Sequence, residues 1–180
     1  GFAVAEGVEI IASKFQPRAV ASDLSAPWEI TYGAADHLWI TERKAAQITR
    51  LDPASGEKTT LFRFDDAYTG ETSHEGVLGM ALDLAGGRVY VAYVYDGDAG
   101  DALDRRMRVT RLSYDAATNT LGQPETVIEG LIAGDDHNAG RLKIGPDGSL
   151  FQSEQGPKTD DERNLLQAGG HYGWPYCYDA

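Results

Sequence analysis

Residues 135–142, DDHNAGRL, place a histidine directly after two aspartates and just before a run with the composition of a strand. A carboxylate beside an imidazole can orient the ring and hold its pKa near the working pH, which general-base catalysis requires. His137 is therefore a candidate base, and Asp136 is the carboxylate that would position it. An Asp-His pair in a loop is also common as a solvated turn, and the residues alone leave both interpretations open.

A second candidate site follows the strand-like run that ends near residue 154, where the chain reads QGPKTDDE over residues 155–162. Glycine permits unusual backbone angles, and proline fixes φ and removes a donor, so the carbonyls of Gly156 and Pro157 can point outward together. Ca²⁺ accepts backbone oxygens at such turns. The acids at 160–162 repel one another unless water or a cation separates them, which predicts either a second Ca²⁺ or an acidic turn facing water.

A third polar group, His74, belongs to SHEGVLG at residues 73–79 and leads into an apolar strand bounded by glycines. Several other kinds of site are excluded by their missing motifs. The sequence has no G-x-G-x-x-G nucleotide loop, no HExxH zinc helix and no G-x-S-x-G serine nucleophile. Its four histidines are too dispersed to predict a zinc cluster.

The amino-acid composition limits the classes of partner that the protein can bind. Asp and Glu outnumber Lys and Arg by 28 to 16, and the net charge of −12 argues against nucleic acid or an anionic membrane as a partner. No apolar run is long enough to span a membrane. Cys177 is the single cysteine, so it has no partner for a disulfide within the chain. The chain starts at Gly1 without an apolar leader, from which we expect a processed or trimmed N-terminus.

The elements that must position these groups read as short strands separated by turns, with 21 glycines and weak helical signals. GAADHLWITE (33–42) and GPDGSLFQSE (145–154) match in register, and GGRVYVAYV (86–94) is a looser third copy. This repeat predicts an all-β meander of about three blade-like units, part of a β-propeller ring, since closed propellers have about 4–8 blades. A β-sandwich with similar turn sequences is the alternative.

Four stretches in this order resemble the soluble, pyrroloquinoline quinone (PQQ)-dependent glucose/sorbosone dehydrogenases, also called aldose sugar dehydrogenases. They are SAPWEITYG…LWITER…ITRLDPASGE (25–57), HEGVLGMAL (74–82), DDHNAGRLKIGPDG (135–148) and, most specifically, QSEQGPKTDDERNLLQAGGHYGWP (152–175). The resemblance implies a six-bladed β-propeller of the bacterial periplasm or cell exterior. It also implies an enzyme that binds Ca²⁺ and reduces PQQ while oxidising an aldose at C1 to the lactone.

The resemblance also implies roles for single residues. His137 would be the general base and Asp136 its acidic neighbour, while the carbonyls of Gly156 and Pro157 would bind the Ca²⁺ that polarises PQQ. His74 stands where a cofactor-contacting Gln or Glu is usual in the family.

The remaining implied roles concern the cofactor and a second cation. Gln155, with His74 and Asp136, is an expected PQQ contact. Asp161, Glu162 and the Tyr172 backbone would surround a second, structural Ca²⁺ near a dimer contact.

The sequence departs from the family by what it lacks. Further blades of the family supply an Arg-Asn pair and Lys and Arg residues that bind the PQQ carboxylates, and no HRNPQG-like segment is present. We expect one partial propeller domain over residues 1–180, with a missing internal block and a spatial gap between Leu150 and Phe151.

The expected partners are a sugar substrate, an unidentified electron acceptor and a second copy in a homodimer. Two other functions stay open at this point. One is a non-catalytic, Ca²⁺-stabilised propeller that binds carbohydrate or protein, and the other is a Ca²⁺-dependent lactonase.

Overall fold

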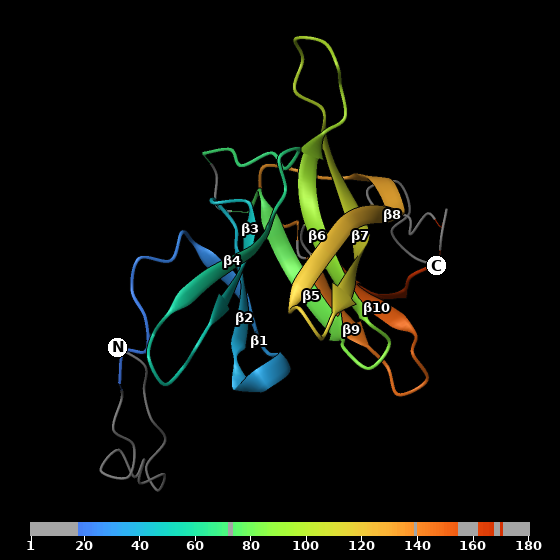
Figure 1. Ribbon diagram of the computed structural model, residues 1–180. Coiled ribbons are helices and arrows are strands. Elements are labelled where there is room, and N and C mark those ends of the chain that lie inside the picture. The colour runs from blue at the N-terminus through green and yellow to red at the C-terminus, as the bar shows by residue number, and fades with distance from the viewer. Residues whose placement is uncertain (1–17, 72–73, 139, 155–161, 168–169, 171–180) are drawn as a thin grey trace, which may run out of the picture.

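The computed structural model describes residues 18–71, 74–138, 140–154, 162–167 and 170, and it is built from three antiparallel sheets that follow one another along the chain (Figure 1). In each sheet the strands are neighbours in the order in which they occur in the sequence. The helical content of the described residues is a short 3-10 turn, and no helix among them is long and apolar enough to cross a membrane. The predicted all-β meander is confirmed.

The first sheet, drawn in blue to teal in Figure 1, has the strand order β1-β2-β3-β4. Its strands are β1 Pro27–Tyr32, β2 Leu38–Glu42, β3 Gln47–Leu51 and β4 Lys58–Arg63, with the 3-10 turn η2 Ala34–Asp36 between β1 and β2. The turn predicted at DPASG joins β3 to β4. There the Gly56 amide donates to the Asp52 carbonyl at 2.8 Å, and Gly56 has φ +79°, a conformation that glycine adopts without a steric penalty.

The second sheet, in green to yellow, has the order β5-β6-β7-β8 and the longest strands. They are β5 Val77–Asp83, β6 Arg88–Asp96, β7 Arg105–Asp115 and β8 Thr120–Ile132. Both faces of this sheet are covered by neighbouring sheets, and its inner strands accordingly read as nearly continuous apolar runs such as VYVAYV. A sheet buried on both faces is what a propeller blade requires, whereas each sheet of a two-layer sandwich has one face in solvent.

The third sheet is smaller, with the order β11-β10-β9. Its strands are β9 Arg141–Ile144, β10 Leu150–Glu154 and β11 Glu162–Leu165. The tight turn between β9 and β10 is closed by the Gly145 amide, which donates to the Ser149 carbonyl at 2.8 Å. β10 continues through Leu150 and Phe151, which pair with Ile144 and Lys143 of β9, so the expected spatial gap is not seen. The missing internal block itself stays a prediction.

The sequence repeat marks the same strand in every sheet. GAADHLWITE contains β2, GGRVYVAYV contains most of β6 and GPDGSLFQSE contains β10, each of which is the second strand of its sheet. Trp39, Tyr90 and Phe151 are thus equivalent positions, as the repeat predicted. The three blade-like units correspond to three sheets of a partial propeller ring.

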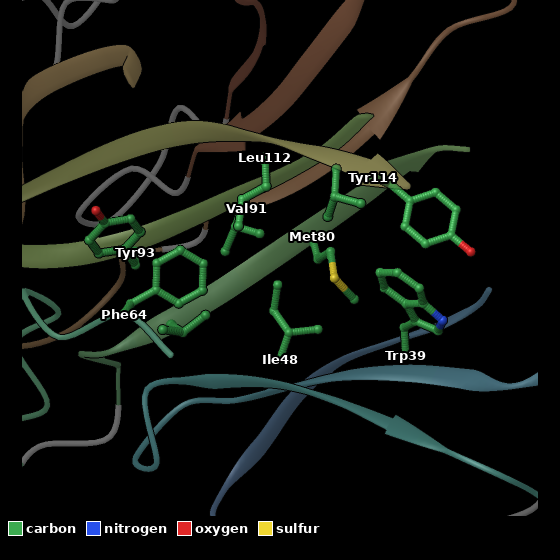
Figure 2. Packing of buried hydrophobic residues seen from close by; sticks show 10 residues of the cluster. Trp39, Ile48, Phe64, Met80, Val91, Tyr93, Leu112 and Tyr114 are labelled. Carbon is green, nitrogen blue, oxygen red and sulfur yellow. The ribbon is translucent and has the colours of Figure 1, made fainter. Parts of the chain in front are cut away.

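Two apolar interfaces hold the sheets together. The first interface, between the first and second sheets, is shown in Figure 2. It contains Trp39, Ile48, Phe64, Val77, Met80, Val89, Val91, Tyr93, Leu112 and Tyr114. The second interface, between the second and third sheets, contains Leu78, Ala81, Ala92, Val94, Met107, Val109, Ile128, Leu142, Leu150 and Leu166. Burying one such large apolar side chain contributes about 1.5–3 kcal/mol.

Strand alternation divides β6 between the two interfaces, with Val91 and Tyr93 facing one and Ala92 and Val94 facing the other. At the inner edge of the sheets, β5 lies against both β1 and β9. The first strands of the three sheets therefore converge, and the loops that precede β5 and β9 start from this convergence.

Candidate functional site

The loops before β5 and β9 bring together His74, Asp136 and His137, which we call the imidazole cluster. The His137 amide donates to His74 Nδ1 at 2.8 Å and to Asp136 Oδ1 at 2.9 Å, across 63 residues of sequence in the first case. The two imidazole rings lie 5.9 Å apart between centroids, tilted by 54°. Two of the motifs singled out in the sequence therefore form one site.

His74 Nδ1 faces two partners, the His137 amide and the Asp136 carboxylate. Its contact with Asp136 Oδ1 is that of an ion pair. One nitrogen cannot accept and donate at the same time, so the neutral His74 ring accepts the His137 amide, while the protonated ring donates to Asp136. In the second state the His137 amide still has Asp136 as its acceptor. The carboxylate is thus shared by both histidines, since His137 Nδ1 lies 3.5 Å from Asp136 Oδ2.

Asn138 fixes the shape of the loop that carries His137. Its Nδ2 donates to the His74 carbonyl at 2.8 Å and to the Gly134 carbonyl at 2.9 Å, and its Oδ1 accepts from the Gly134 amide at 2.8 Å. The side chain is buried, so these bonds are shielded from water. They hold His137 at φ +59°, a left-handed conformation that is uncommon for a residue with a Cβ. The imidazole of His137 stays 44% exposed and open to a ligand.

A partly buried ion pair lies beside the cluster, next to His74 in the sequence. The Glu75 side chain is fully buried and pairs with Arg105 at the start of β7, while Arg43 Nη1 donates to the Glu75 carbonyl at 2.9 Å. The hydrogen bond to Glu75 raises the pKa of Arg105 above its usual value. Trp28 of β1 packs edge-on against His74, with ring centroids 5.6 Å apart. All three sheets therefore help to position the cluster.

Several residues that support the cluster carried little signal in the sequence. Asn138 stood in the quoted DDHNAG motif directly after His137, but nothing in that motif shows that its side chain is buried. Glu75 was a charged residue directly before an apolar strand, which is a signal of a buried ion pair. Trp28 carried no signal that distinguished it from an ordinary core aromatic.

A cavity of about 430 Å³ lies along the converging strands β1, β5 and β9. Its lining includes Thr31, Met80 and Leu142, and the ion pair between Arg141 Nη1 and Glu29 Oε2, 2.7 Å long, borders it. The imidazole cluster does not line this cavity but lies at the opposite end of β5, before its first residue.

The predicted calcium ligands fall mostly outside the described residues. Gly156, Pro157, Asp161 and Tyr172 all lie there, and so does Gln155, the expected PQQ contact. The spacing between the Gly-Pro turn and His137 therefore stays a prediction. Within the described ranges, no group of three or more His, Cys, Asp or Glu side chains is arranged to hold a metal ion.

Glu162 is the one predicted calcium ligand that the structure describes. It opens β11 and pairs in register with Glu154 at the end of β10. Burial and, after it, the charge of Glu162 raise the pKa of Glu154, against the hydrogen bond that Asn164 donates to it at 3.0 Å. Two carboxylates thus face each other at the point where the predicted calcium segment begins and ends.

Comparison with known proteins gives a consistent result. The family model described as "Glucose / Sorbosone dehydrogenase" matches residues 24–153 and 146–179. Among curated proteins, quinoprotein glucose dehydrogenase B of Acinetobacter calcoaceticus is 24% identical over 250 residues, covering 89% of this chain and 52% of that protein. The chain therefore spans about half the length of this curated relative.

Solved structures agree in fold. The PQQ-bound aldose sugar dehydrogenase of Streptomyces coelicolor matches with a TM-score of 0.60 and 26% identity, over 89% of this chain and 66% of that one. The apo soluble aldose sugar dehydrogenase of Escherichia coli matches with a TM-score of 0.60 and 18% identity, over 88% of this chain and 65% of that one.

The two matched stretches of the family model overlap at residues 146–153, the segment that contains the β9–β10 turn and most of β10. This segment thus resembles the family at two places. The missing internal block stays a prediction.

Proposed function

This chain belongs to the glucose/sorbosone dehydrogenase family, and from that premise we propose that the whole protein is a PQQ-dependent quinoprotein that oxidises an aldose at C1 to the lactone. The observation that carries the proposal is the imidazole cluster. It joins the His74 and His137 motifs, which the resemblance assigns to cofactor contact and to catalysis, through the hydrogen bond from the His137 amide to His74.

The described residues fit the proton-removing end of such a site. His137 is exposed, held by a rigid loop and backed by a carboxylate, as a general base must be. PQQ also carries three carboxylates that need cationic partners. Arg105 is already bound to Glu75, so we infer that the carboxylates are bound elsewhere in the whole protein. His74, Asp136 and Gln155 are the proposed contacts on this chain.

In the proposed reaction His137 removes the proton of the sugar C1 hydroxyl through Nε2, while the C1 hydrogen leaves with its electron pair and a C=O bond forms. Asp136, 3.5 Å from His137 Nδ1, stabilises the imidazolium that results. The hydrogen bonds from Asn138 to the Gly134 and His74 carbonyls would hold the loop that carries His137 in place. When bound, PQQ supplies the hydride acceptor, and Ca²⁺ on the carbonyls of Gly156 and Pro157 polarises it.

Further properties are proposed on the same basis. A second Ca²⁺ would be bound by Glu162, Asp161 and the Tyr172 backbone near a homodimer contact. The protein would work in the periplasm or outside the cell, and an electron acceptor of unknown identity would reoxidise the cofactor.

The test is reconstitution of the full-length protein with Ca²⁺ and PQQ, followed by dye reduction with several aldoses. We expect His137→Ala to lower kcat by roughly 10²–10⁴-fold, the usual contribution of a general base. His37→Ala is the matched control, because His37 lies on the β1–β2 turn and contacts the Ala35 carbonyl rather than the cluster. Retained turnover in His137→Ala would remove that residue from the base role.

The same experiment separates the other functions. Calcium binding without a bound-quinone absorption band would favour a binding propeller. Lactone hydrolysis that needs Ca²⁺ but no quinone would favour a lactonase.

A further inference from the structure

A second cavity, of about 310 Å³, lies at the outer end of the first interface, between β4 of the first sheet and β6, β7 and β8 of the second. None of its lining residues belongs to β1, β5 or β9, the strands that converge at the inner edge of the sheets. Figure 2 shows the boundary of this region, with Phe64 and Tyr93 at the end of the interface opposite to Trp39 and Tyr114. The second cavity is therefore separate from the imidazole cluster and from the cavity of about 430 Å³ along β1, β5 and β9.

Aromatic side chains form one side of this outer cavity. Phe62 and Phe64 pack edge to face with centroids 4.9 Å apart, and Phe64 lies 4.9 Å from Tyr93. Phe62 is only partly buried and so presents ring surface toward the opening. Such a wall suits a ligand with an apolar face.

An unpartnered buried hydroxyl lies in the same cavity. Thr110 of β7 is 2% exposed, and its Oγ1 has no hydrogen-bond partner among the residues that the structure describes. Leaving a buried hydroxyl unsatisfied costs about 1–3 kcal/mol. Valine has the same shape and would avoid this cost, so the hydroxyl needs a reason to be there.

The charged groups around the cavity are already compensated. Arg108 Nη1 pairs with Asp66 at 2.7 Å, its Nη2 pairs with Glu129 at 3.0 Å, and its guanidinium lies 3.8 Å from the Tyr95 ring centre. The Tyr93 hydroxyl donates to Asp66.

Arg63 and Asp65 also line the cavity, so its two cationic side chains are matched by two carboxylates. Arg108 Nε is a second buried donor without a hydrogen-bond partner among the described residues. With its charges balanced, the site favours a neutral molecule that offers hydroxyl groups.

We propose that the outer cavity binds a neutral saccharide, one pyranose unit in size. Its C–H face would lie on Phe62, and one of its hydroxyls would bond with Thr110. A cavity of this volume is at the lower end of small-molecule sites, roughly 300–1,000 Å³, which suits a single ring better than a longer chain. The proposal goes beyond the proposed dehydrogenase function, because this second sugar site lies apart from the imidazole cluster.

The probe is methyl α-D-glucopyranoside, whose C1 hydroxyl is blocked, titrated into quinone-free full-length protein and followed by amide NMR shifts. We expect saturable shifts in β4 and β7 with millimolar affinity. Thr110→Val should fold as well as the wild type, since its hydroxyl has no partner, yet bind the probe about 3- to 10-fold more weakly, the value of one net hydrogen bond.

Two controls make the result specific. Thr59→Val changes an exposed threonine on β4 and should leave the affinity unchanged. His137→Ala should also leave it unchanged, which separates this site from the proposed catalytic one. Phe62→Ala should weaken binding independently of Thr110. Equal affinity in wild type and Thr110→Val, shifts confined to the loops before β5 and β9, or no saturable shift at all would each overturn the proposal.

Discussion

The first interface is filled by large aromatic rings, whereas the second brings two stretches of backbone almost into contact. In the first, Trp39 meets Tyr114 edge-on with centroids 5.4 Å apart, and Phe64 meets Tyr93 at the other end. In the second, a Cβ added to Gly79 of β5 would lie 1.9 Å from the Gly140 carbonyl oxygen. The two interfaces therefore use different means to hold sheets together.

The position of each interface explains the difference. Gly79 is five residues after His74, and Gly140 is three residues after His137. The close approach of the two glycines thus limits how far apart the imidazoles can lie. The buried residues of the first interface are not among those that contact the imidazole cluster, so they can be packed mainly for burial. We infer that the first interface mainly provides stability and the second mainly provides geometry.

The largest expected effect is that of Trp39→Ala in the first interface. Trp39 is fully buried, so we expect a loss of about 3–5 kcal/mol in the free energy of unfolding, measured by urea denaturation with circular dichroism. Ile30→Ala on β1 is the control, because Ile30 is 56% exposed and should change stability by less than about 0.5 kcal/mol. If Trp39→Ala lowered the free energy of unfolding by no more than an ordinary surface substitution does, the first interface would not be a main source of stability.

Gly79→Ala tests the second interface. The added methyl must push β5 away from Gly140, at a cost of about 1–3 kcal/mol for overpacking. We expect the imidazole NMR signals of His74 and His137 to shift. Turnover of the reconstituted enzyme should also change, by more than the small unfolded fraction that this loss of stability produces.

A matched control for Gly79→Ala is Gly100→Ala in the loop between β6 and β7. Its new methyl would come no nearer than 3.3 Å to a flexible Asp98 carboxylate, so neither stability nor the histidine signals should change. Unperturbed histidine signals in Gly79→Ala would show that the glycine contact does not set the cluster geometry.

The remaining predictions concern two carboxylates, one in the first sheet and one in the third. Burial works to raise the pKa of Glu42 in β2, but hydrogen bonds from the Ser25 amide, Thr49 and Gln47 lower it overall. A lowered folded-state pKa stabilises the protein above the unfolded-state pKa, and this stability is lost as the pH falls through the folded-state pKa. Glu42→Gln should thus destabilise at pH 7 by about 1–3 kcal/mol, with a smaller difference in acid.

Glu154 in β10 should behave in the opposite way. Its pKa is raised, so the ionised carboxylate costs stability above the folded-state pKa, and this cost disappears as the pH falls below the unfolded-state value. Glu154→Gln should raise the urea midpoint at pH 7 in the calcium-free protein and have little effect in acid. Urea midpoints over a pH series check both variants, and shifts of the same sign would contradict the assignment.

Much of the fold could be predicted because it depends on local patterns. Trp39, Tyr90 and Phe151 recur in register, and the turns at Asp52–Gly56 and Gly145–Gly148 contain residues with strong turn preferences. The strands β4 and β11 were less visible, since KTTLFR and ERNL show no clear alternation of polar and apolar residues.

The site could be predicted only in part. His137 and Asp136 stand next to each other in the sequence, so their partnership was visible. The bonds that Asn138 makes to His74 depend on the approach of β5 and β9, which no local pattern encodes. The pairing of Glu75 with Arg105 likewise joins residues 30 positions apart.

Every described sheet is completed by strands that are consecutive in the chain, so a sheet can be gained or lost as one uninterrupted stretch of gene without rethreading its neighbours. The gain or loss of a sheet must preserve only one thing, the fit between the apolar surfaces of the sheets that become neighbours. Copy number can therefore drift during evolution while each surviving unit keeps its own pairing, and rings of different size become accessible from one ancestral repeat.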